Sequence, residues 1–329
     1  MINMKKRNYI ILFLALLVSC MLGIIFGSVK IEPEMFIKGL VWSEDALNQS
    51  IIIYHLRIPR VLAGLLAGVG LSISGVLLQS VTGNDLAGPN IIGVNAGAGF
   101  FCILMLSFFP TMLKFLPIAA FTGAFLTTLL ILLIVKKVNS KRSTVILAGI
   151  AVTTLLNAGI SFLSLLDSDV LASYNSFSIG GLRGAEIDEL IVPGIIIAVC
   201  FIISLLFSRQ THLLCLGDSV ASSLGVKTKT VRFIGLICAS ASAAAVVSFA
   251  GLLGFVGLVV PHISRRICGS EQKNLLITSG FVGAILVIIA DLVGRVLLAP
   301  TEIPVGILMA ILGAPFFLFL LIRRRTDND

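Results

Sequence analysis

The chain has little charge for its length. Only 12% of its 329 residues are Asp, Glu, Lys or Arg, whereas 57% are hydrophobic. A soluble domain usually carries about 25% charged residues, so this composition excludes an ordinary soluble protein. A bilayer core about 30 Å thick needs about 20 apolar residues per helix, which leaves room for roughly ten spans. We therefore expect an all-α polytopic membrane protein with one domain over residues 1–329.

Motifs for catalysis and for metal binding are also absent. The sequence contains no H-E-x-x-H, no G-x-S-x-G and no cluster of carboxylates and histidines placed for acid–base chemistry. The six cysteines and three histidines are scattered singly, so the cysteines are expected to be small apolar core residues. We predict no catalytic residue, no metal site and no cofactor bound by this chain. A membrane enzyme would need a polar cluster at one membrane face, which the sequence does not offer.

The nucleotide-binding loop G-x-x-x-x-G-K-[ST] is missing as well, and no Gly-Lys dipeptide occurs anywhere. If ATP drives this protein, a partner chain must bind the ATP and its Mg²⁺. The net charge of +8 is best explained by basic residues at the cytoplasmic membrane face, and not by binding to nucleic acid.

Ten apolar runs separated by polar breaks predict ten transmembrane helices. They cover about 9–28, 58–81, 91–109, 115–135, 143–166, 190–208, 232–250, 253–267, 275–298 and 304–322. The third and the eighth are short and rich in glycine. The basic start followed by the run Tyr9 to Gly27 resembles a signal peptide, but it lacks a cleavage site, so we expect a first transmembrane helix. A cleaved signal is the alternative.

Lysine and arginine orient these helices, because cytoplasmic loops carry an excess of both. With the N-terminus inside, 17 of the 24 basic residues fall in inner segments and seven fall in outer ones. Both termini are therefore predicted to be cytoplasmic. Arg57, Arg60 and Arg295 then lie outside, against the general trend.

Small residues and one ion pair indicate how the helices pack. Gly64 with Gly68, and Gly93 with Gly97, form small-x-x-x-small pairs that favour close helix packing over a pore-lining role. Asp291 and Arg295 are spaced i, i+4 within the ninth span, so they can pair on one helix face. A carrier coupled to protons or sodium would usually need more intramembrane carboxylates than this.

Two polar segments are predicted to form short helices outside the membrane. In the outer segment between Asp167 and Glu189, we expect a helix at about 172–181, which either lines an entrance or is an inert part of the surface. In the inner segment, residues 216–232 (LGDSVASSLGVKTKTVR) predict a helix of small residues followed by a turn and three basic residues. Such a helix presents little bulk to the cytosol, which suits docking into a partner's groove.

Four long motifs resemble the FecCD family of permeases from ABC importers, the group that carries vitamin B12, ferric siderophores and haem. The motifs are RIPRVLAGLLAGVGLSISGVLLQ, NDLAGPNIIGVNAGAGF, GFVGLVVPHISRRICG and ADLVGRVLLAPTEIPVGILMAILGAPFFLFLL. The resemblance covers essentially the whole chain. It implies a type II ABC importer permease fold and a multi-pass protein of the bacterial cytoplasmic (inner) membrane.

The resemblance also implies roles for individual residues. Arg57, Arg60 and Arg295 match positions that bind glutamates on the two lobes of an extracytoplasmic substrate-binding protein. As exposed pairs they would contribute about 0 to 1 kcal/mol each, so they would orient a transient complex. Asn84, Leu86 and Ser143 match a cytoplasmic gate, although short polar residues at helix ends are as often simple caps.

The region at about 217–231 matches the family's coupling helices, which fit a cleft of the ATPase. Gly217, Asp218, Ala221 and Gly225 carry that match, with Asp218 standing where glutamate is common. The resemblance thus implies ATPase subunits, a binding protein and a second permease copy or homologue as partners. Ferric siderophore is the first expected cargo, and haem and cobalamin follow. A stand-alone secondary transporter of metals or organic ions is the alternative.

Overall fold

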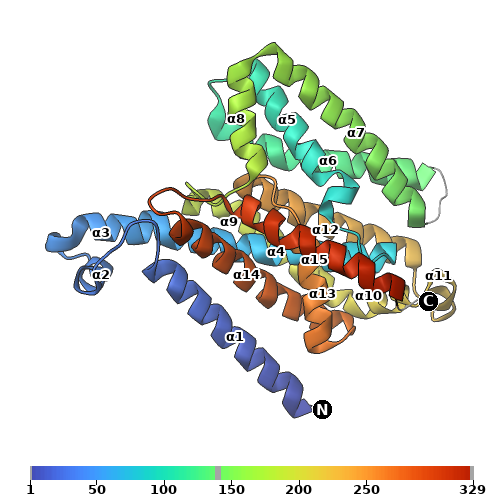
Figure 1. The fold of residues 1–329 in the computed structure, drawn as a ribbon. Helices are drawn as coiled ribbons and strands as arrows, with labels where there is room; N and C mark the ends of the chain where they lie inside the picture. The colour runs from blue at the N-terminus through green and yellow to red at the C-terminus, as the bar shows by residue number, and fades with distance from the viewer. Residues whose placement is uncertain (1, 138–141, 327–329) are drawn as a thin grey trace.

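The computed structural model describes residues 2–137 and 142–326, and the regular secondary structure in this part of the chain is all helical (Figure 1). The long helices match the ten predicted spans in order. They are α1 (Ile2–Ile25), α4 (Ile58–Thr82), α5 (Val94–Phe108), α6 (Leu116–Lys137), α7 (Arg142–Leu166), α9 (Ile187–Leu206), α12 (Thr228–Ala250), α13 (Val256–Cys268), α14 (Gln272–Leu297) and α15 (Val305–Thr326).

Shorter helices connect these ten. They are α2 (Pro33–Leu40), η1 (Glu44–Ala46), α3 (Leu47–Ile51), the π-helical turn η2 (Ile52–Arg57), η3 (Pro89–Ile92), η4 (Leu113–Phe115), α8 (Ser168–Ile179), α10 (Ser208–Cys215) and α11 (Asp218–Ser223). Within the described residues, seven helices are long and apolar enough to cross a membrane. The protein is therefore a multi-pass membrane protein, and the ten-helix prediction agrees with its architecture.

The bundle has two distinct ends. Figure 1 shows α2 and α3 at one end, and α11 with the last turns of α15 at the other. The start of α1 points toward the side where α11 lies. We call these the α2/α3 end and the α11 end.

Helix α4 is the centre of the bundle and packs against α12, α13 and α14. Its second half is almost completely buried, and it includes small residues at the positions of closest contact. A Cβ atom at Gly68 would meet the backbone of Gly283 and Ala284, and one at Gly97 would meet the carbonyl oxygen of Gly123. The packing interpretation of these glycines is therefore confirmed, because only glycine permits such close approach.

Two element boundaries differ from the prediction for identifiable reasons. The helix expected at 172–181 is α8 and begins at Ser168, because the Asp167 Oδ1 atom accepts the N–H groups of Asp169 (2.8 Å) and Val170 (3.4 Å) as an N-cap. It ends at Gly180, whose φ is +73°. Helix α12 begins at Thr228, four residues before the predicted start, so Lys229 and Arg232 lie in its first turns and Lys227 is its N-cap.

Three non-helical segments meet beside α8: the chain after α8, the end of α12 and the chain before α15. Backbone hydrogen bonds join them, from Gly181 N–H to Ala250 O (2.9 Å) and from Gly306 N–H to Gly180 O (3.2 Å). In a membrane protein, non-helical backbone between the spans is tolerated where it is buried in protein or lines a water-filled cavity. Here it lines a cavity.

Candidate functional site

Arg57 lies where η2 passes into α4, close to the end of α1. Its Nη1 atom donates to Ile24 O (2.8 Å) and its Nη2 atom donates to Val29 O (2.7 Å). These carbonyls belong to the last turn of α1 and the chain just beyond it, where helix carbonyls lack partners within the helix. A cation there is also favoured by the helix dipole. Arg57 therefore holds α1 against α4.

Arg60 is one turn further along α4 and binds two acids. Its Nε and Nη2 atoms donate to the carboxylate of Asp291 on α14 at 2.9–3.0 Å, and its Nη1 atom donates to Glu302 Oε2 at 2.8 Å. Arg295 completes the group, with its Nε atom 3.1 Å from Asp291 Oδ2 and its Nη2 atom donating to Gly23 O (3.1 Å). The predicted Asp291–Arg295 pair is confirmed, and Arg60 joins it.

The three arginines were expected to be exposed, and that part of the prediction is wrong. Arg57 is 4% exposed, Arg295 is 2% exposed, and the side chain of Arg60 is 11% exposed. The reason is that carbonyls and acids from α1, α14 and the 298–304 segment already satisfy their guanidinium groups. Their docking to a binding protein stays a prediction.

Glu302 connects this arginine cluster to the surface. Burial alone would raise the pKa of Glu302, but the hydrogen bonds from Arg60 and Ser28 and the charge of Arg183 hold it below its usual value. The carboxylate is therefore ionised at neutral pH. It offsets part of the positive charge of the neighbouring arginines.

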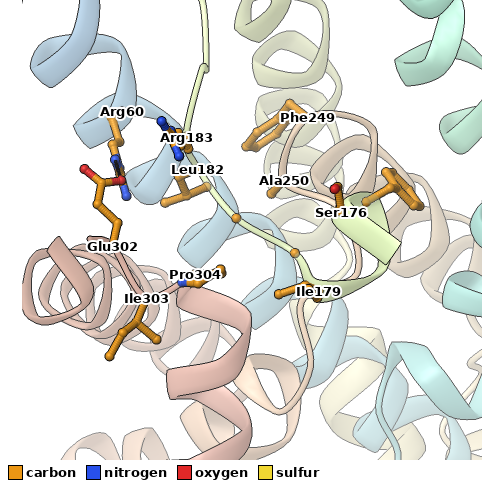
Figure 2. Close-up of a pocket in the computed structure, with 14 residues that line it drawn as sticks. Arg60, Ser176, Ile179, Leu182, Arg183, Phe249, Ala250, Glu302, Ile303 and Pro304 are labelled. Atoms are coloured by element: carbon orange, nitrogen blue, oxygen red, sulfur yellow. Dashed lines mark hydrogen bonds and ion pairs between the residues drawn. The ribbon is translucent and has the colours of Figure 1, made fainter. Parts of the chain in front are cut away.

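A cavity of about 450 Å³ adjoins Arg60 and Glu302 at the meeting of the three non-helical segments. Figure 2 shows Arg60, Arg183 and Glu302 grouped on one side, with Ser176 and Phe249 on the other. The remaining wall is apolar side chains and glycine backbone. Its members are Phe177, Ile179, Gly180, Gly181, Leu182, Ala250, Gly251, Ile303 and Pro304.

The predicted coupling residues gather at the α11 end. The backbone of Gly217 (φ +112°) and of Gly225 (φ +80°) turns the chain before and after α11, in conformations that favour glycine. Asp218 receives two hydrogen bonds from Arg232 Nη2, at 2.7 and 2.9 Å, which tie α11 to α12. Ala221 is completely buried. The predicted helix and turn are thus present.

The exposed apolar side chains of this region are not among the predicted coupling residues. Leu216 and Leu224 are each 59% exposed, and Val220 is also exposed. Ala221 points inward and allows α11 to pack closely, so a partner at this end would meet the larger apolar side chains around it. Only Val220 lies within α11, since Leu216 caps the end of α10, Leu224 caps the end of α11 and Gly217 breaks the chain between the two helices. Helical spacing in the sequence therefore could not have grouped them.

The predicted gate residues lie in and near the segment after α4. The Asn84 Oδ1 atom accepts a hydrogen bond from the N–H of Leu86 (3.0 Å). Asn84 therefore stabilises the turn after α4, a local structural role like the cap that is the alternative to a gate. Leu86 is half-buried and lines a cavity of about 80 Å³ together with Leu71 and Leu258. Ser143 falls in the first turn of α7, and its side chain lies outside the described residues.

Two acids that form ion pairs here were not selected from the sequence, and a third, Asp291, has a further partner that the sequence did not indicate. Glu302 binds Arg60, and Asp85 lies 3.3 Å from Arg265, which links the segment of the predicted gate to α13. Asp291 was seen only as a partner of Arg295. Arg60 and its two acids are separated by more than 200 residues, so no spacing rule could have joined them.

Comparison with known proteins decides the family. The sequence matches the FecCD transport family over residues 15–323. The chain belongs to the FecCD family. This assignment agrees with the motifs along the whole chain and with the helical architecture.

Relatives of the FecCD chain cover nearly all of its length. It is 36% identical to the Fe(3+)-citrate import system permease protein YfmE of Bacillus subtilis over 95% of this chain and 93% of the relative. It is 34% identical to the iron(3+)-hydroxamate import system permease protein FhuG of the same organism, over 94% of this chain and 95% of the relative. As a FecCD protein the chain is an ABC importer permease subunit and not an enzyme.

A solved structure shares this architecture. A metal-chelate type ABC transporter in an inward-facing conformation superposes with a TM-score of 0.86 at 29% identity, covering 97% of this chain and 99% of the other. The agreement over almost the full length confirms the type II permease fold. In this family the ATPase is a separate subunit, in agreement with the missing nucleotide-binding loop.

Proposed function

We propose that this FecCD permease imports a ferric chelate across the bacterial cytoplasmic membrane, driven by ATP that a separate subunit hydrolyses. The observation that carries the proposal is the family match over residues 15–323, together with relatives named as ferric citrate and ferric hydroxamate permeases. Ferric siderophores are the first candidate cargo, and haem and cobalamin follow. The excess of basic residues at the α11 end supports cytoplasmic termini.

The arginine cluster at the α2/α3 end is proposed as the docking region for a substrate-binding protein. Arg60 is the member closest to solvent, at 11% exposure, and it is the one that carboxylates of a partner would reach first. Arg57 and Arg295, which bind the end of α1, would hold the docking surface in shape. A partner's glutamate would have to compete with Asp291 and Glu302, so docking through Arg60 implies rearrangement of this cluster.

At the α11 end we propose that ATPase subunits receive Leu216, Val220 and Leu224, in a shape set by Gly217, Asp218, Ala221 and Gly225. The Asp218–Arg232 ion pair would pass a movement of α11 directly to α12. The neighbouring link from Asp85 to Arg265 would connect the proposed gate at Asn84, Leu86 and Ser143 to α13. A second permease copy or a homologue would complete the pathway.

The test is ATP-dependent uptake by the reassembled importer. The permease would be coexpressed with its ATPase and binding protein, placed in lipid vesicles, and supplied with radioactive ferric citrate, a ferric hydroxamate or haem. We expect uptake that requires both ATP and the binding protein and that an imposed proton gradient does not change. Uptake by the permease alone, driven by a proton or sodium gradient, would instead establish the secondary-carrier alternative.

A further inference from the structure

The cavity beside Arg60 has the size and setting of a ligand site. Its volume of about 450 Å³ lies within the range of about 300–1,000 Å³ that small-molecule sites occupy. Its walls come from three segments far apart in the chain, at the ends of α8 and α12 and before α15. Backbone hydrogen bonds hold those segments together, so the cavity has a defined shape.

The charges that line the cavity do not cancel. Arg60 and Arg183 face it with Glu302 as the sole acid among the lining residues, which leaves one net positive charge. Arg60 is fully engaged, because its donors are divided between Asp291 and Glu302. Asp291 brings no further negative charge to the cavity, since it is also paired with Arg295.

Of the two arginines that line the cavity, Arg183 is the one whose guanidinium group is available to a ligand. Within the described residues, it has no hydrogen bond or ion pair of its own, and Glu302 beside it already receives Arg60. The side chain is exposed and borders the cavity next to Leu182 (Figure 2). A guanidinium group presents paired N–H donors in a plane that matches a carboxylate. An anionic ligand in the cavity would supply the missing partner.

We propose that this cavity is a binding subsite for a negatively charged, carboxylate-bearing ferric chelate, with Arg183 binding a carboxylate of the ligand. The inference rests on the proposed function, because it specifies which class of ferric chelate the permease favours. Two citrates bring six carboxylate charges to one Fe³⁺, which neutralises three of them, so a ferric dicitrate chelate is an anion. Three hydroxamates lose three protons and cancel the charge of Fe³⁺, so such a chelate offers Arg183 nothing to bind.

The apolar part of the cavity fits the rest of such a ligand. Phe177, Ile179, Phe249 and Pro304 contribute hydrocarbon surface to the cavity wall, and Figure 2 shows Ile179 and Phe249 across from Arg60 and Glu302. Ligand sites typically combine apolar walls with a few polar groups that fix orientation. Arg183 would therefore act as a residue that determines charge specificity, while the apolar wall accepts either class of chelate.

The test is direct binding to the full-length permease in lipid nanodiscs, without its partners. Radioactive ferric citrate and a neutral ferric trihydroxamate would be titrated against the wild type, Arg183→Gln, Arg183→Lys and the control Lys114→Gln. Lys114 is an exposed basic residue of the neighbouring η4 that does not line the cavity. We expect Arg183→Gln to bind ferric citrate about tenfold more weakly. Arg183→Lys should bind with an affinity between those of the wild type and Arg183→Gln, because it keeps the charge and loses the paired donors, and Lys114→Gln should stay within about twofold of the wild type.

Binding of the neutral chelate should be the same in all four proteins. The proposal is overturned if the wild type does not bind ferric citrate, if Arg183→Gln binds it normally, or if the neutral chelate loses affinity to the same extent. The vesicle assay separates this outcome from failure of the proposed function. ATP-driven uptake of a ferric chelate that is unaffected by Arg183→Gln would refute the subsite alone, and absence of such uptake would refute the proposed function.

Discussion

Asp291 is the residue whose loss the bundle should tolerate least. It is 3% exposed and pairs with both Arg60 and Arg295, so Asp291→Asn would leave two buried guanidinium groups short of a negative charge. Removing one partner of a buried pair costs about 3–5 kcal/mol. We expect a clearly lower melting temperature of the purified protein in detergent.

The control variant Glu34→Gln breaks the exposed Glu34–Lys38 pair and should leave the melting temperature nearly unchanged. Equal melting temperatures of the two variants would contradict the structure.

At the scale of elements, the contact between α4 and α14 depends on glycine at one place and not at another. A Cβ atom at Gly283 would meet Ser72 Oγ and Gly68 O, whereas one at Gly280, a turn earlier in α14, would meet nothing within 4 Å. Gly283→Ala should therefore destabilise the protein by about 1–3 kcal/mol through overpacking. Gly280→Ala should be neutral or stabilising by up to about 1 kcal/mol. Thermal unfolding of the two variants compares them, and reversal of their order would show that the helices pack differently.

Helix α11 offers the second test at this scale. Leu224 is 59% exposed, so Leu224→Glu should leave folding unchanged while weakening a partner that covers this face. We expect ATP hydrolysis by the assembled importer to lose its stimulation by the loaded binding protein. Lys114→Gln, at the exposed lysine of η4, lies outside the predicted coupling region and serves as the control. Full stimulation in Leu224→Glu would place the ATPase contact elsewhere.

At the scale of the whole molecule, the two ends of the bundle should face opposite sides of the membrane. Glu186, before α9, and Ser219, on α11, are both exposed, and the proposed topology puts them on opposite sides of the membrane. In a background with Cys215 replaced by serine, Glu186→Cys should react with a membrane-impermeant thiol reagent in cells whose outer barrier has been opened. Ser219→Cys should react only once the cytoplasmic membrane is broken. The opposite pattern would invert the proposed topology.

Much of this protein follows from the sequence alone. An apolar run about 20 residues long spans a bilayer as a helix, because the helix pairs all of its backbone polar groups. The apolar runs therefore predicted ten helices, with most boundaries correct to within about four residues. The i, i+4 spacing of Asp291 and Arg295 gave their pairing, because that spacing puts two side chains on one helix face. The four long motifs indicated the family.

The tertiary structure decided which groups meet across the bundle. It brought Arg60 to Asp291 and Glu302, turned Arg57 and Arg295 inward to the end of α1, and left Arg183 beside a cavity without an acid of its own. These arrangements depend on how α1, α4, α14 and three loops pack, and no local pattern encodes a contact between residues more than 200 positions apart. The exposure of a charge is a property of its neighbours in space, which is why the sequence could not predict that these arginines are buried.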